Sequence, residues 1–159
     1  VYYFQCAKEK LSLRLSSIVE NVHGLDFVPP VQLYQSILGV HGQQWIELFA
    51  EIEKCSDYEY LILDLTDGVS DLWDILRSCT HVYTITRGDG VSLAKMDQYE
   101  RGLRTMEYED VLAKTRKIEF PVFKEIPIRF DELTYGDLAR YVKQYIIPDF
   151  EGEEEEGNE

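Results

Sequence analysis

Two groups of polar and glycine residues follow short apolar runs near the middle of the chain. The first run covers residues 60–63 (YLIL) and the second covers residues 81–86 (HVYTIT). The residues that end or follow these runs are Asp64, Thr66, Asp67 and Gly68 in the first group, and Thr86, Arg87, Gly88, Asp89 and Gly90 in the second. Ligands of open α/β sheets bind at the carboxyl ends of strands, so the two groups stand where a binding site is expected.

The elements that must position these groups are strands alternating with helices. A continuous apolar run such as residues 60–63 is typical of a strand covered on both faces of a parallel sheet. Apolar residues at helical spacing predict a helix over residues 43–54 and others after Ser70 and after Ser92. Shorter elements are predicted as helices at 11–20 and 108–114, strands at 25–28 and 117–123, and a closing helix that contains Leu138, Tyr141, Val142 and Tyr145.

This alternation predicts an α/β fold built of βαβ units, with a three-layer, doubly wound, mainly parallel sheet of the Rossmann-like kind. Such a sheet normally opens on a strong strand and a glycine-rich turn, and neither is present here. We therefore expect the sheet to be incomplete at its amino-terminal end. Residues 1–150 are expected to be the later portion of one domain.

Local signals predict where several helices begin and end. Ser70 and Ser92 are the expected N-caps of the two helices that follow them. Thr134 with Asp137 three residues later resembles a capping box for the closing helix, and Pro148 is expected to end that helix. Pro121 makes an edge position the expectation for the last strand.

Composition limits the classes of function. The chain has 159 residues and a formal net charge of −14, to which the glutamate-rich tail at 151–159 contributes strongly. That tail is expected to be disordered, and an acidic chain without a basic stripe is not expected to bind nucleic acid directly. Three cysteines at unrelated spacing indicate reduced thiols rather than a disulfide framework, and the three histidines do not form a zinc motif. With no targeting or membrane-spanning signal, we expect a cytoplasmic protein.

Residues 57–97, DYEYLILDLTDGVSDLWDILRSCTHVYTITRGDGVSLAKMD, resemble the second half of the deviant-Walker ATPases of the MinD/ParA group, a SIMIBI class of P-loop NTPases. The pattern is an apolar strand ending in Asp, a glycine loop, a helix, a strand ending in a hydroxyl residue and a serine-led helix. The segment GLDFVPP at 24–30 and the turn IPIR at 126–129 are also similar to that group. The nearest branch is the CpaE-like one, which is associated with pilus assembly and localisation.

The resemblance implies a nucleotide site that uses ATP and Mg²⁺ in the full-length protein. Asp64 would be the Walker-B-type carboxylate that holds a water on Mg²⁺, an ion that prefers oxygen ligands and keeps several waters. The residues that would lie around the nucleotide are Asp67, Gly68, Thr86, Arg87 and Pro127. The family further implies an ATP-dependent homodimer, protein partners in pilus or secretion assembly, and at most an indirect association with membranes.

Two departures bear on catalysis. The family's phosphate loop, K-G-G-x-G-K-[ST], is absent from the 159 residues, so this chain alone is not expected to hydrolyse ATP. ATPase activity would need that loop to precede the chain in the full-length protein. The strand whose asparagine reads the adenine base is also not visible, and RKIEFPVFKEIPIR stands at 116–129 in its place.

Other interpretations stay open at this point. Asp64 and Asp67 are of a type that also shapes turns and caps helices without binding any ligand. The chain could be a non-catalytic interaction scaffold of the same fold that binds no nucleotide. A receiver-like phosphoacceptor domain is a third hypothesis, but it needs an acidic pair after a first strand and a lysine at the last one, for which Lys124 is only loosely placed.

Overall fold

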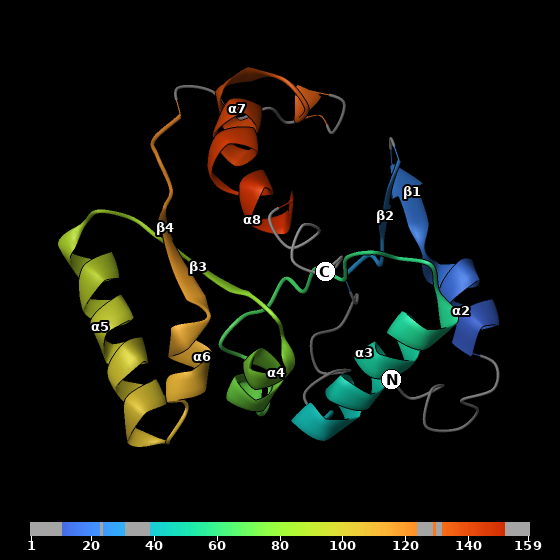
Figure 1. Ribbon diagram of the computed structural model, residues 1–159, viewed down its shortest axis with the longest axis horizontal. Helices are drawn as coiled ribbons and strands as arrows, with labels where there is room; N and C mark the ends of the chain where they lie inside the picture. Colours follow the sequence, from blue (N-terminus) through green and yellow to red (C-terminus); the bar gives the residue numbers. More distant parts are fainter. Residues whose placement is uncertain (1–10, 23, 31–38, 124–128, 130–131, 152–159) are drawn as a thin grey trace, which may run out of the picture. The chain divides into compact units, whose positions relative to one another are not determined.

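The computed structural model describes residues 11–22, 24–30, 39–123, 129 and 132–151 (Figure 1). Contacts divide the chain into two compact units. The first holds positions 1–20 and 28–120, and the second holds positions 21–27 and 121–159. Within the described part, the chain is mixed α/β, with one parallel and one antiparallel pair of strands. The wider three-layer sheet is not among the described residues.

A parallel βαβ unit is the centre of the first unit. Strand β3 (Val82–Thr86) pairs in parallel with β4 (Thr115–Glu119), in a register that runs from Val82 opposite Thr115 to Thr86 opposite Glu119. The connection consists of α5 (Gly90–Thr105) and α6 (Glu109–Ala113), which lie beside the two strands (Figure 1). The predicted alternation of strand, helix and strand is therefore confirmed over residues 82–119. Strand β4 ends before Pro121, which cannot donate a ladder hydrogen bond.

The core of this unit lies between β3 and the two connecting helices. Val82, Leu103 and Val111 form the buried cluster, and Leu103 and Val111 are fully buried. Partly buried side chains from α4 (Leu72–Ser78) and from the connection pack against it, namely Trp73, Leu76, Cys79, Tyr99, Tyr108 and Leu112. Trp73 is thus one of the α4 side chains that pack against the core.

A polar network joins α4 to α6. The Arg77 guanidinium donates two hydrogen bonds of 2.8 Å to the Asp110 carboxylate and lies 4.0 Å from the centre of the Tyr108 ring. The Tyr108 hydroxyl donates to Asp74 at 2.6 Å, and the Lys114 ammonium donates to the Arg77 carbonyl at 2.6 Å. Hydrogen bonding to Arg77 lowers the pKa of Asp110. These contacts hold α4 against α6.

The beginnings of α3 (Gly42–Cys55) and α4 meet at Asp71. The Gly42 backbone N–H donates to the Asp71 carboxylate at 2.8 Å, and a Cβ added at Gly42 would come within 2.6 Å of the Asp71 Cβ. Asp71 precedes α4 in the left-handed region, with φ of 54°. The prediction of Ser70 as the N-cap of this helix is wrong, because Asp71 occupies that position.

The predicted strand at residues 60–63 is wrong for the structure as described. This run is neither helix nor strand in the structure, and it crosses from α3 to α4 as a coil (Figure 1). Tyr60, Leu61 and Ile62 are 47%, 38% and 76% exposed. A strand needs a neighbour to pair its backbone groups, and in the described part of the chain β3 and β4 pair only with each other. Without a neighbour, the apolar run cannot join a sheet.

The amino-terminal elements are short. Helix α2 (Leu11–Ile18) contacts α3, and β1 (Glu20–Val22) pairs with β2 (Leu25–Phe27) around Gly24, whose φ is 89°. The predicted helix at 11–20 and strand at 25–28 are confirmed, each slightly shorter than expected. A positive φ at the tip of such a ribbon favours glycine.

Two helices close the chain, α7 (Gly136–Tyr145) and α8 (Ile147–Glu151). Tyr141 packs edge-on against Phe123 with ring centres 6.2 Å apart, and Ala139 is buried. The predicted capping box at Thr134 is wrong, because the helix begins at Gly136 after Tyr135. Pro148 does not end α7 but lies in the first turn of α8, where its missing N–H costs no helical hydrogen bond.

None of the helices in the described ranges combines the length and the apolar character needed to cross a membrane. Cys55 and Cys79 are free thiols. Cys79 is half-buried, whereas Cys55 is exposed at the end of α3.

Removing the centre of the βαβ core should destabilise the chain strongly. Leu103→Ala deletes a fully buried side chain and leaves a cavity, so we expect the free energy of unfolding to fall by about 2–5 kcal/mol. Leu93→Ala is the matched control on the same helix, because Leu93 is 54% exposed. Urea denaturation followed by circular dichroism measures both, and equal losses in the two variants would contradict this assignment of the core.

Candidate functional site

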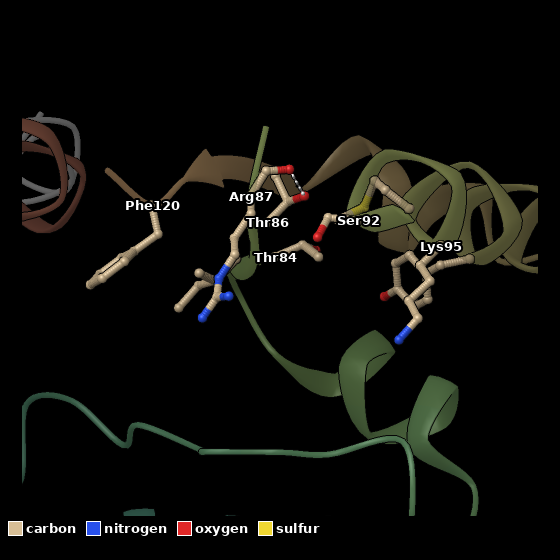
Figure 2. Close-up of a pocket in the computed structure, with 9 residues that line it drawn as sticks. Thr84, Thr86, Arg87, Ser92, Lys95 and Phe120 are labelled. Atoms are coloured by element: carbon tan, nitrogen blue, oxygen red, sulfur yellow. Dashed lines mark hydrogen bonds between the residues drawn. The ribbon is translucent and has the colours of Figure 1, made fainter. Parts of the chain in front are cut away.

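A cavity of about 490 Å³ lies at the carboxyl end of β3, between that strand and α5 (Figure 2). It lies within the first unit. Its polar lining combines hydroxyl and cationic groups, and an aromatic ring adds to its wall; the residues labelled in Figure 2 are Thr84, Thr86, Arg87, Ser92, Lys95 and Phe120. This is the position at which α/β sheets bind ligands.

One face of α5 supplies the helical wall. Ser92, Lys95, Met96 and Tyr99 follow one another at spacings of three, one and three residues, which places them on the same side of a helix. Met96 and Tyr99 make the inner wall apolar, and Ser92 and Lys95 bring a hydroxyl and an ammonium group to it. The lysine is therefore positioned by the same periodicity that packs the helix.

The strand supplies the opposite wall. Thr84 and Thr86 are two residues apart and so point to one face of β3, and Arg87 follows directly after the strand. The Thr86 hydroxyl donates to the Arg87 carbonyl at 3.2 Å (Figure 2). The Phe120 backbone N–H donates to the Thr86 carbonyl at 2.9 Å, so pairing with the β4 chain continues one residue past the strand. This bond brings Phe120 to the cavity.

Gly88 lies close to the Glu119 side chain at the carboxyl ends of the two strands. A Cβ at this position would collide with the Glu119 carboxylate. Glu119 is the partner of Thr86 in the register, so the parallel pairing itself brings this carboxylate close to residue 88. A side chain at position 88 would push the Glu119 carboxylate aside.

The acid in the loop between β3 and α5 caps the helix. Asp89 is the N-cap of α5: its carboxylate accepts hydrogen bonds of 3.0 Å from the Val91 and Ser92 backbone N–H groups and one of 2.7 Å from the Ser92 hydroxyl. The Ser92 backbone and hydroxyl bonds lower the pKa of Asp89. The prediction of Ser92 as N-cap is thus wrong, since Ser92 instead donates to the cap and lines the cavity.

The charged side chains that line the cavity are both positive. Arg87 and Lys95 line it, and no carboxylate residue does so in the part of the chain that the structure describes. Neither cation forms an ion pair with a described carboxylate, whereas Arg101 and Arg104 on the same helix pair with Asp97 and Glu100 at 2.7 and 3.2 Å. In a chain with a net charge of −14, two unpaired cations beside one cavity are a feature that a bound anion would explain.

The structure brings together two of the residues that the sequence singled out, Thr86 and Arg87. Asp64, Asp67 and Gly68 do not line this cavity; they lie in the turn region between the coil at 60–63 and α4. Pro127 lies outside the described residues. Lys95 and Phe120 were missed by the sequence analysis. The spacing of three between Ser92 and Lys95 was the available signal for Lys95, whereas Phe120 depends on pairing between distant strands.

Asp64 has an exposed side chain, and its carboxylate is of the ligand type that Mg²⁺ accepts when most of its other ligands are waters. Within the ranges described here, no group of three or more His, Cys, Asp or Glu side chains is arranged to hold a metal. The donor chemistry therefore fits a single-carboxylate magnesium site and not a cage of protein ligands.

Comparison of the chain with protein-family models, with curated proteins and with solved structures found no match. Function must therefore be inferred from the residues and geometry of the chain itself.

The Asp89 cap should make the stability of the fold decrease at acidic pH. Because the folded-state pKa of Asp89 lies below its ordinary value of 3.8, the charged carboxylate stabilises the chain above that pH. The contribution is lost as the pH falls through the lowered value. We expect Asp89→Asn to lower the melting temperature at pH 7 and to differ less from the unmodified chain at pH 3.

Asp97→Asn is the control for this experiment, because Asp97 is an exposed acid on the same helix that pairs with Arg101 and caps nothing. Thermal unfolding at both pH values measures the difference. A gap between the unmodified chain and Asp89→Asn that stays constant from pH 7 to pH 3 would contradict the role of the charged cap.

Proposed function

We propose that this chain is part of a nucleotide-binding domain of the MinD/ParA-like group, in its CpaE-like branch, and that the nucleotide site includes the carboxyl end of β3. In the full-length protein the domain would act as an ATP-dependent dimerisation switch in spatial positioning or in pilus or secretion assembly. ATP hydrolysis would require a phosphate loop supplied from outside these 159 residues. The doubly wound sheet of that group is part of the proposal.

The cavity beside β3 is the observation that carries the proposal. It lies at the carboxyl end of a parallel βαβ unit, and its volume of about 490 Å³ is within the range of small-molecule sites, roughly 300–1,000 Å³. Arg87 and Lys95 give it the charge that a phosphate-bearing ligand needs, and the Thr84, Thr86 and Ser92 side chains offer hydroxyl groups.

Asp64 would contribute the metal-dependent part of nucleotide binding. Its carboxylate would hold a water on Mg²⁺, and the ion would neutralise charge on the nucleotide phosphates. Asp67 and Gly68 lie in the turn that follows and would shape this part of the site. The proposal requires residues 60–63 to pair as a strand in the complete domain, and their exposed apolar side chains support that requirement.

The second candidate function is a non-catalytic interaction scaffold of the same fold. The exposure of Tyr60, Leu61 and Ile62 favours it, because a run of large apolar side chains at the surface is a site at which another polypeptide can pack. A scaffold would use this run to bind a partner and would have no need of Mg²⁺ or ATP. The two candidates therefore differ in whether nucleotide binds at all.

Calorimetry with Mg²⁺-ATP on the full-length protein separates the two candidates. We expect binding, and we expect Asp64→Ala to weaken it by about tenfold or more, since a hydrogen bond to a charged group contributes roughly 1.5–3 kcal/mol. Glu59→Ala is the matched control, because Glu59 is an exposed acid at the other end of the same apolar run.

Absence of any binding to the unmodified protein would exclude the nucleotide proposal and leave the scaffold. Binding that is unchanged in Asp64→Ala would remove Asp64 from the site while keeping the nucleotide. Equal weakening by Glu59→Ala and Asp64→Ala would show that general charge, and not the position of Asp64, governs the affinity.

A further inference from the structure

We infer that Arg87 and Lys95 form an anion clamp that binds a phosphate group directly, without a metal ion. This inference rests on the proposed function and deepens it, because it assigns the phosphate contact to two cations rather than to a metal held by Asp64. The clamp is defined as the Arg87 guanidinium and the Lys95 ammonium at the cavity beside β3.

The two cations come from different elements that the fold holds in place. Arg87 follows β3, and Lys95 lies in the second turn of α5. In Figure 2 the Arg87 and Lys95 side chains lie on either side of Thr84 and Ser92. The Asp89 cap fixes the start of α5, and strand pairing fixes the end of β3, so the fold holds the backbone of both residues in place.

The charges around the cavity favour an anion and disfavour a cation. Its lining carries two positive side chains and, within the described residues, no carboxylate. The only acid in the connecting loop, Asp89, is occupied by three hydrogen bonds at the start of α5. A divalent ion in the cavity would be repelled by both Arg87 and Lys95, whereas a phosphate-bearing anion would be attracted by both and could accept hydrogen bonds from them.

The ligand class follows from these groups. A guanidinium offers a planar fork that matches two phosphate oxygens, and an ammonium offers a compact point charge. Neutral hydroxyls beside them, from Thr84, Thr86 and Ser92, suit the remaining oxygens of a phosphate or a diphosphate. The clamp therefore selects the phosphate portion of the nucleotide, and pyrophosphate is the smallest probe that contains it.

Calorimetry with pyrophosphate in the presence of EDTA tests the inference on the full-length protein. We expect binding without Mg²⁺, and we expect Arg87→Gln and Lys95→Gln each to weaken it about tenfold, the low end of the effect of a charged hydrogen bond. The double variant should bind no pyrophosphate. Lys143→Gln is the matched control, since it removes the same charge from an exposed position on α7 that does not line the cavity.

The possible outcomes distinguish failure of the clamp from failure of the proposed function. Binding of Mg²⁺-ATP together with no binding of pyrophosphate in EDTA would overturn the clamp and leave the proposed function intact. Unchanged affinity in both Arg87→Gln and Lys95→Gln, or equal weakening in Lys143→Gln, would also overturn it. Failure of the unmodified protein to bind either probe would overturn both proposals. Circular dichroism of each variant establishes that a loss of binding is not a loss of folding.

Discussion

The parallel pairing of β3 with β4 is the constraint on which the rest of the first unit depends. Two parallel strands cannot be joined by a tight turn, so the chain must leave the end of β3, cross beside the pair and return to the start of β4. Helices α5 and α6 make that crossing, and burial of Leu103 and Val111 holds them there. The same pairing brings the carboxyl ends of both strands to one edge, where Phe120 meets the end of β3.

The short loop after β3 both starts the next helix, through Asp89, and brings a charged side chain to the cavity, through Arg87. Gly88 avoids the Glu119 side chain, and Asp89 caps the helix. With the acidic residue used as a cap, Arg87 brings a positive charge to the cavity and forms no ion pair with a carboxylate of the described residues. Lys95, one helical turn beyond Ser92, adds a second such cation. The overall charge of the chain is strongly negative, so this local excess of positive charge sets the cavity apart from the acidic surface.

Residues 60–63 form a coil, although their local sequence predicts a strand. Its composition is that of a buried strand, but its side chains are exposed and its backbone has no strand neighbour within the described residues. Helix α4, which follows it, is nevertheless fixed firmly by the contacts of Arg77 and Tyr108 with α6 and Asp74. The loop that carries Asp64 and Asp67 therefore ends at a fixed helix and begins at a segment that needs a partner. Under the proposed function, a neighbouring strand would complete this part of the nucleotide site.

Helical periodicity and short apolar runs in the sequence predicted α2 to α7 and the strand–helix–strand order from β3 to β4, because these are local properties that survive in the fold. The last strand lies at Thr115–Glu119, a little before the predicted 117–123, and α8 was not predicted. The sequence by itself also determined that Thr86 and Arg87 stand at the end of a strand. The N-cap residues Asp71, Asp89 and Tyr135 were not predicted. Several neighbouring polar residues could cap each helix, and packing selects among them. The places of Lys95 and Phe120 at the cavity, and the absence of a strand at residues 60–63 in the described part of the chain, followed from the tertiary structure, because both depend on contacts between residues far apart in the chain.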